Sequence, residues 1–163
     1  MREVKIIKAQ YEHFEGIWEI FYQVIQKGDS YVYDPHTTKD EAYEIWMKQP
    51  CVYVALIDGV VAGSYKMKQN YPGLGSHVAN CSYIVSNNFR GNGIGKLMGE
   101  HSLRTAKELG FIAMQFNIVV STNLVAVNLW KSIGFDIIAT IPKSFNHKEL
   151  GLVDSYIMHQ FLK

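Results

Sequence analysis

The sequence predicts one α/β domain of the α+β type, spanning residues 1–163, with a mixed and mostly antiparallel sheet of about seven strands and helices on both faces. A chain of 163 residues has the size of a single domain. Hydrophobic residues make up 48% of it and charged residues 19%, which is typical of a globular protein with a sizeable core. Segments with strand and helix periods succeed one another as β-α-α-β-β-β-α-β-α-β-β, so antiparallel hairpins precede a β-α-β crossover.

The first fifty residues indicate one strand and two helices. Residues 3–8 alternate weakly in hydrophobicity, as a strand does, and residues 11–26 repeat apolar side chains at helical spacing. Thr38 followed by Glu41 is a capping box, which predicts the start of a second helix. Pro50 closes that helix.

The centre of the chain indicates three successive strands. Asp58-Gly59 is a strong hairpin turn between residues 51–57 and residues 60–69. A turn-rich loop then leads to a further strand over residues 77–85. These three strands form the antiparallel part of the predicted sheet.

The last third of the chain alternates between helices and strands. Residues 94–109 have apolar side chains at helical spacing and are followed by Gly110. Residues 111–120 are mostly apolar, which predicts a strand buried on both faces. The remaining segments are a short helix, a strand, a loop and a last strand, over residues 123–133, 135–141, 142–151 and 152–162.

Composition excludes several classes of partner. The net charge of +1 argues against broad binding of nucleic acid, which needs a concentrated basic face. Cys51 and Cys81 lack metal-ligand spacing, so we expect buried thiols in a reducing compartment and no metal. The N-terminus has no apolar core of a signal peptide, and no run approaches the roughly 20 apolar residues of a membrane span. The sequence therefore predicts a cytoplasmic protein without a membrane partner.

A glycine-rich turn between a strand and a helix is the most informative motif. Its glycines let a ligand approach the backbone, and the first amides of the helix have no helical partners and lie at the positive end of the helix dipole. A cation stands at each end of the turn, so the arrangement suits a diphosphate. The motif consists of Arg90, Gly91, Asn92, Gly93, Ile94, Gly95 and Lys96.

Other interpretations of this turn differ in what they require. A Walker loop is excluded because Gly-Lys-[Ser/Thr] is missing. A dinucleotide fingerprint belongs in the first βαβ unit, whereas this turn lies past the midpoint of the chain, after an antiparallel region. A third interpretation, a glycine-rich turn that binds no ligand, stays open.

Two motifs together resemble the GCN5-related N-acetyltransferase family. The first is [Arg/Gln]-x-x-Gly-x-[Gly/Ala], present as Arg90, Gly93 and Gly95 after the apolar strand Tyr83-Ile84-Val85. The second is Asn-x-x-Ala-x-x-Leu-[Tyr]-x-x-x-Gly-Phe, which matches residues 123–135 with tryptophan at the tyrosine position. Their separation and the order of strands also fit, so the resemblance covers nearly the whole chain.

The resemblance implies acetyl-CoA as the cosubstrate. Amides from Gly91 to Lys96 are expected to bind the pyrophosphate, and the edge of Tyr83 to Val85 is expected to pair with the pantetheine arm like an added strand. In this family the fourth and fifth strands splay, and the thioester lies in the gap, with residues 117–119 on the opposite wall. The residues implied to contact the cofactor are Tyr83, Ile84, Val85, Arg90, Gly91, Asn92, Gly93, Ile94, Gly95, Lys96, Asn123, Asn128 and Trp130.

Acyl transfer to an amine needs a deprotonated amine, a hydrogen-bond donor for the thioester oxygen and a departing thiolate. Many family members have an acidic tyrosine where this chain has Trp130, and an indole N–H is not a usable acid, so we assign no acid. Trp130 fits a role in core packing as well as it fits a contact with the cofactor. The strand over residues 77–85 has no carboxylate, so the base stays open between side chains and a water, which we prefer. The candidates are Tyr156, Tyr83 and Asn117, the histidines His77 and His159, and a water held by Asn80, Ser82 or Asn117.

Two segments could surround the acceptor. In this fold the segment between the first two helices overhangs the acceptor site, and here it supplies Tyr31, Tyr33 and Asp34, which could hold a cationic or aromatic amine. The loop over residues 142–151, with Phe145, is the other candidate lid, because it is longer than a hairpin needs. Either segment is also readable as ordinary loop packing. The acceptor stays open between a small amine, an amino acid, a peptide N-terminus and a lysine.

The sequence therefore predicts an acetyl-CoA-dependent N-acetyltransferase that transfers acetyl directly to a primary amine in a ternary complex. The alternative is an acyl-CoA-binding sensor module of the same fold with weakened catalysis. Trp130 and the missing carboxylate favour that alternative. A monomer and a homodimer both fit the sequence.

Overall fold

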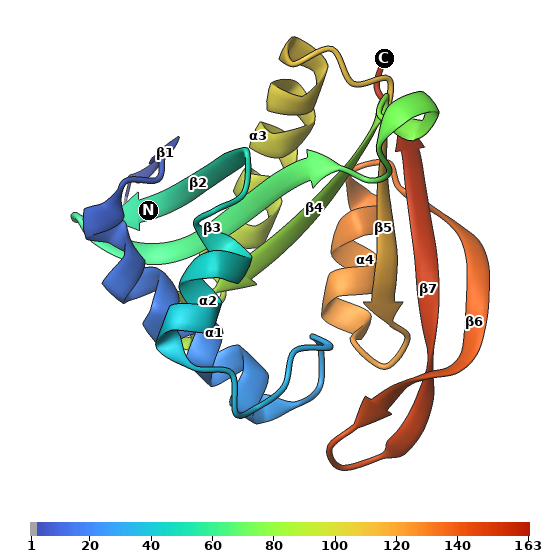
Figure 1. Cartoon of the computed structure of the whole chain (residues 1–163), viewed down its shortest axis with the longest axis horizontal. Coiled ribbons are helices and arrows are strands. Elements are labelled where there is room, and N and C mark those ends of the chain that lie inside the picture. Colours follow the sequence, from blue (N-terminus) through green and yellow to red (C-terminus); the bar gives the residue numbers. More distant parts are fainter. Residues whose placement is uncertain (1–2) are drawn as a thin grey trace.

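The computed structural model describes residues 3–163 and shows the predicted mixed sheet with helices on both faces (Figure 1). Met1 and Arg2, with which the predicted domain begins, lie outside the described residues. The strands lie in the order β1-β2-β3-β4-β5-β7-β6, and every neighbouring pair is antiparallel except β4 and β5. The elements are β1 (Val4–Lys8), α1 (Phe14–Lys27), α2 (Lys39–Trp46), β2 (Cys51–Ile57), β3 (Val60–Gln69), β4 (Val78–Val85), α3 (Ile94–Glu108), β5 (Ala113–Val120), α4 (Leu124–Ser132), β6 (Asp136–His147) and β7 (Gly151–Phe161).

The first two helices cover one face of the sheet. The apolar stripe of α1 packs with α2 against β2 and β4, and a left-handed residue, Gly28, ends the helix. The predicted capping box of α2 is confirmed, because Thr38 Oγ1 accepts from the Glu41 amide and the Glu41 carboxylate accepts from the Thr38 amide. Trp46, fully buried at the end of α2, donates from Nε1 to Ser64 Oγ at 2.9 Å.

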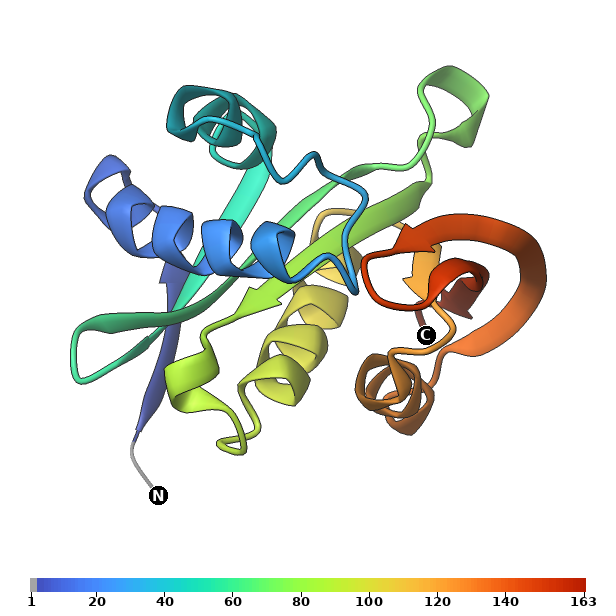
Figure 2. The same ribbon diagram turned by 90° about the horizontal axis from the view of Figure 1, so that it is seen from below.

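The other two helices cover the opposite face, as Figure 2 shows. The apolar side chains of α3 and α4 form a second core with β2 to β5 and β7, which includes Tyr65, Met98 and Trp130. Within residues 3–163, no helix combines the length and the apolar character needed to cross a bilayer. The sheet is therefore buried between two helical layers, and access to its centre depends on where its strands separate.

The fourth and fifth strands separate early, which confirms the predicted splay. Parallel pairing of β4 with β5 is limited to Val78 with Ala113 and Ala79 with Met114. Beyond this point β5 continues with β7 alone on its other side, through a register shift between Phe116 and Val119. The prediction that residues 111–120 are buried on both faces was wrong at the shift, where Ile118 is 43% exposed, because this stretch has lost its β4 neighbour.

The predicted loop over residues 142–151 was wrong, because β6 continues to His147. After a register shift between Ile141 and Phe145, the strand pairs again with β7, and the turn is confined to residues 148–150. At the shift Lys143 has a positive φ of 51°, and its amide donates to Asp154 Oδ1 at 2.9 Å. This segment is an edge strand, where proline and polar side chains are tolerated, so its composition resembled a loop.

Candidate functional site

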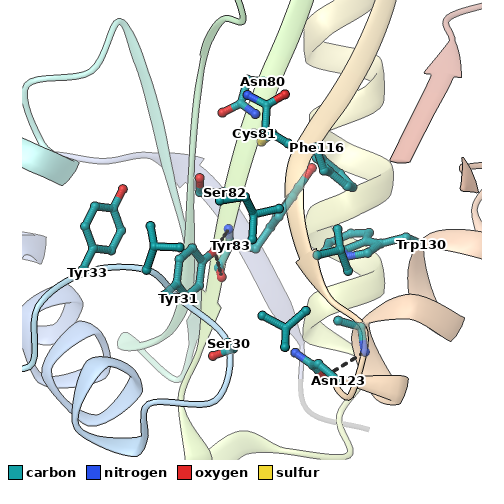
Figure 3. Close-up of a pocket in the computed structure, with 16 residues that line it drawn as sticks. Ser30, Tyr31, Tyr33, Asn80, Cys81, Ser82, Tyr83, Phe116, Asn123 and Trp130 are labelled. Carbon is teal, nitrogen blue, oxygen red and sulfur yellow. Dashed lines mark hydrogen bonds between the residues drawn. The ribbon is translucent and has the colours of Figure 1, made fainter. Parts of the chain in front are cut away.

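A cavity of about 250 Å³ lies where β4 and β5 diverge (Figure 3). Asn80 closes its apex, because its Nδ2 donates to the Gln115 carbonyl across the gap at 3.0 Å. Below this bridge the cavity is open along the facing edges of the two strands. Its walls are formed by Ser30, Tyr31, Val32, Tyr33, Asn80, Cys81, Ser82, Tyr83, Phe116, Asn117, Ile118, Val119, Val120, Asn123, Ala126 and Trp130.

The glycine-rich turn follows β4 after a short 3₁₀ helix, Asn87–Phe89, and begins α3. Gly91 and Gly93 have φ values of 82° and 71°, a left-handed conformation that favours glycine. A β-carbon at either position would have no other atom within 4 Å, so the turn faces open space. Arg90 and Lys96 are exposed at its two ends. The turn therefore presents unpaired helix amides and two cations to solvent, as the sequence predicted for an anion.

Other residues of the turn hold its shape. Ile94 is buried, and Asn92 Nδ2 donates to the Phe89 carbonyl at 3.0 Å. A β-carbon at Gly95 would lie 3.1 Å from Leu129 Cδ2, so this glycine allows α3 to approach α4. This glycine therefore also serves helix packing, and the access for a ligand that the sequence suggested stays a prediction.

Successive side chains of β4 point to opposite faces of the sheet, so the strand presents its backbone edge to the cavity. The Tyr83 hydroxyl lies 2.7 Å from Ser102 Oγ on the α3 side, and burial raises its pKa well above the usual value. Ile84 is buried in the core formed with α1. The phenol of Tyr83 thus belongs to the core, and its main-chain groups face the gap.

Of the three cofactor contacts predicted on α4 and at its N-cap, two line this wall of the cavity. Asn123 caps the helix, its Oδ1 accepting from the Ala126 amide at 3.2 Å (Figure 3). Trp130 is 8% exposed and packs 4.6 Å from the Tyr83 ring and 4.8 Å from the Phe116 ring, measured between centroids. Asn128 is exposed on α4 and is not among the lining residues. Trp130 therefore both packs in the core and lines the cavity.

The segment between α1 and α2 forms the opposite wall. The Tyr31 hydroxyl accepts from the Tyr83 amide at 2.8 Å and donates to the Tyr83 carbonyl at 2.6 Å. The Tyr33 ring stacks on Tyr31 at 5.9 Å and also lines the cavity. Asp34 is exposed outside it and accepts from the His36 amide. Phe145 is 5% exposed within β6 and does not line the cavity either.

The candidate bases differ in position. Asn117 lines the cavity and donates to Asn70 Oδ1 at 2.7 Å, and Ser82 also lines it. Tyr156, on β7, pairs with Val119 of β5 but is not a lining residue. His77 precedes β4 outside the lining, and the His159 ring packs against Phe161 in a separate surface depression. Among the residues described, the cavity wall contains neither a carboxylate nor a histidine.

The titratable groups in the wall are therefore tyrosines and one cysteine. Burial raises the pKa of Tyr31, Tyr33 and Tyr83, and it raises the pKa of the Cys81 thiol to about 12. All four groups are neutral at pH 7. The cavity is thus polar without being charged, which favours a bound carbonyl or amide and gives no anchor for an ammonium.

Lys66 is a residue near the site that the sequence did not indicate. It lies on β3, is 8% exposed, and donates from Nζ to Tyr33 Oη at 3.0 Å and to the Ile45 carbonyl at 2.9 Å. Burial lowers its pKa to about 8. A lysine two residues before Lys68 in a strand suggests a solvent-facing position, so no sequence signal marked it. Within residues 3–163, no group of three His, Cys, Asp or Glu side chains is placed to hold a metal ion.

Comparisons with known proteins agree with this geometry. Residues 14–135 match the model of the acetyltransferase (GNAT) family. N-acetyltransferase aca1 from Schizosaccharomyces pombe is 31% identical over a region that covers 82% of this chain and 72% of that protein. A GCN5-related N-acetyltransferase from Kribbella flavida has a solved structure that superposes with a TM-score of 0.94 at 38% identity, over 98% of both chains. A phosphinothricin acetyltransferase from Sinorhizobium meliloti, solved in complex with acetyl-CoA, shares the fold with a TM-score of 0.87 at 19% identity, over 98% of this chain and 88% of that one.

Proposed function

The chain belongs to the GNAT acetyltransferase family and is an acyltransferase, and from this premise we propose that it transfers the acetyl group of acetyl-CoA directly to a primary amine in a ternary complex. One observation carries the proposal. The turn with unpaired amides follows β4 after one short 3₁₀ helix, Asn87–Phe89, and the edge of β4 that faces the gap lines the cavity. One extended ligand with a diphosphate at one end can therefore occupy both sites.

The donor would be held mainly by main-chain groups. The amides of Gly91 to Lys96 bind the pyrophosphate, and Arg90 and Lys96 add positive charge. The pantetheine arm pairs with the edge of β4 at Tyr83 to Val85 as an added strand. Asn123 and Trp130 form the facing wall, and Asn128 contacts the arm from the surface of α4. The exposure of the turn, and the place of Tyr83, Asn123 and Trp130 in the cavity wall, support these assignments.

The chemistry then proceeds without a strong side-chain acid or base. An ammonium acceptor gives one proton to bulk solvent through a water held by Asn80, Ser82 or Asn117, and the lone pair of the resulting amine attacks the thioester carbon. The Tyr83 amide, whose present partner is the Tyr31 hydroxyl, donates to the oxygen as negative charge develops on it. The C–S bond then breaks, CoA leaves as a thiolate, and the new amide nitrogen gives its surplus proton to the same water. Tyr83 and Tyr156 are less suitable bases, because one phenol is bonded to Ser102 and the other lies outside the cavity wall.

The acceptor would approach past the segment between α1 and α2, which forms one wall of the cavity. Tyr31 and Tyr33 are the contacts nearest to the gap, and a small amine can meet both. Asp34 and Phe145 lie outside the lining. Only a larger acceptor such as a peptide would reach Asp34, and Phe145 would affect the acceptor indirectly, through the position of β6. A cytoplasmic location, and a monomer or homodimer, remain predictions of the sequence.

Release of free CoA thiol tests this proposal. Purified protein is mixed with acetyl-CoA and a panel of small amines, amino acids, peptides and lysine derivatives, and thiol is measured over time. We expect release that depends on one amine class and saturates in both substrates. The matched controls are Gly93→Asn and Gly93→Asp, and with acetyl-CoA near the wild-type Kd the Asp variant should release thiol more slowly than the Asn variant. Tight binding of CoA without amine-dependent release would instead favour the alternative, an acyl-CoA-binding module with weakened catalysis.

A further inference from the structure

The edge of β4 that faces the gap already has a hydrogen-bond partner at Tyr83. On one side Tyr83 lies opposite Tyr65 of β3. On the other side, past the last pair of the β4–β5 ladder, its N–H and C=O are both bound by the Tyr31 hydroxyl. A single phenol oxygen thus replaces the strand neighbour that Tyr83 lacks.

The Tyr31 hydroxyl is well suited to this position. It is buried, and burial raises its pKa, so the group stays protonated and can donate to the carbonyl while it accepts from the amide. The ring is supported by stacking on Tyr33 at an interplanar angle of 17°. The loop that carries both rings is fastened near its ends, by the Lys148 amide to the Gly28 carbonyl and by Gln26 to the Pro35 carbonyl.

This contact conflicts with donor binding. An amide N–H makes one well-aligned hydrogen bond, with the acceptor about 2.9 Å away and near the N–H direction. Two oxygens cannot both occupy that position. The Tyr83 amide points into the gap where the proposed function places the thioester, and the oxygen that now accepts from it belongs to Tyr31.

We infer that the Tyr31 hydroxyl and the acyl carbonyl oxygen compete for the Tyr83 amide, so that binding of acetyl-CoA displaces the hydroxyl from it. This inference rests on the proposed function. Because Tyr31 is also a wall of the acceptor pocket, its displacement remakes that pocket. Tyr31 is in this sense a positioning residue, which links the donor site to the acceptor pocket.

Removal of one oxygen atom tests the inference. Tyr31→Phe keeps the ring and its stacking on Tyr33 but leaves the Tyr83 amide without its internal partner. Acetyl-CoA no longer competes with a hydrogen bond, so its Kd should fall about fivefold, the effect of one ordinary hydrogen bond. CoA has the pantetheine arm that pairs with the same strand edge but lacks the acyl carbonyl, so its Kd should fall by less than that of acetyl-CoA. Isothermal titration calorimetry measures both.

Tyr22→Phe is the matched control. It also removes one tyrosine hydroxyl, but from an exposed ring on α1 that lies outside the cavity lining. Its acetyl-CoA Kd should equal that of the wild type. Unchanged or weaker acetyl-CoA binding by Tyr31→Phe would overturn the inference, whereas absence of binding to the wild type would overturn the proposed function itself.

A second measurement covers the case in which Tyr31→Phe does not fold. A crystal structure of the wild-type protein with acetyl-CoA should show Tyr31 Oη beyond hydrogen-bonding distance of the Tyr83 amide, with an acyl oxygen in its place. Tyr31 still bonded to that amide beside a bound acetyl-CoA would contradict the inference.

Discussion

Gly93 offers the most direct perturbation of the proposed diphosphate site. It is the N-cap of α3, with a φ of 71° and a ψ of 12°, and a β-carbon there would meet no atom within 4 Å. Asp and Asn are the non-glycine residues that tolerate this left-handed conformation best. Gly93→Asp and Gly93→Asn therefore have the same shape and a similar conformational cost, of about 1 kcal/mol. They differ only by one negative charge.

The magnitude follows from Coulomb's law. Two unit charges about 4 Å apart in water interact by about 1 kcal/mol, and a bound diphosphate carries roughly two charges. The carboxylate of Gly93→Asp should therefore weaken binding by about 2 kcal/mol relative to Gly93→Asn, or about 30-fold in Kd. The turn is exposed, so the difference should shrink as salt approaches 1 M, where the Debye length is about 3 Å.

Calorimetric titration of both variants with CoA, at low and high salt, measures this difference. Thermal unfolding of the two variants provides the control, because a similar Tm shows that the fold is equally intact. Equal CoA affinity for Gly93→Asp and Gly93→Asn at low salt would refute the assignment of the diphosphate to this turn.

Two further predictions concern groups behind the cavity wall. Lys66 has a pKa of about 8, below the ordinary 10.5, so between these pH values the unfolded chain binds more protons and stability rises with pH. In urea unfolding, the free energy of unfolding should rise less between pH 8 and 9.5 for Lys66→Met than for the wild type. An equal rise for both proteins would contradict the lowered pKa of Lys66. Cys81 lines the cavity, but its pKa of about 12 makes its thiolate scarce at neutral pH, so Cys81→Ala should keep amine-dependent turnover within about threefold. Loss of turnover with an intact fold would indicate a covalent acetyl-cysteine step.

The parts of the fold that depend on local signals could be predicted from the sequence. The capping box at Thr38 and the hairpin at Asp58-Gly59 each determine structure within a few residues, and both elements formed as predicted. The turn over residues 90–96 was likewise located by its glycines. The splay between β4 and β5 was predicted only through the family resemblance, because nothing local marks where two parallel strands stop pairing.

The errors come from features that depend on distant residues. Residues 142–147 resembled a loop because an edge strand carries polar side chains, and their pairing is decided by β7. Asn128, Tyr156, Asp34 and Phe145 lie outside the cavity lining, and their roles at the site stay predictions of the sequence. The bond between Tyr31 and Tyr83 joins residues 52 positions apart, and the contact of Lys66 with Tyr33 spans 33. No periodicity or motif encodes such contacts.

Direct acetyl transfer to an amine is the central claim, and a single-turnover experiment with isotopically labelled acetyl-CoA tests it. Enzyme in excess over labelled donor is mixed with the amine that supports thiol release, quenched at successive times, and analysed by mass spectrometry of both protein and amine. We predict that the label appears on the amine nitrogen at the rate of thiol release and that no acetylated protein accumulates. Label on the protein before it reaches the amine, or thiol release without a labelled amine, would contradict the account.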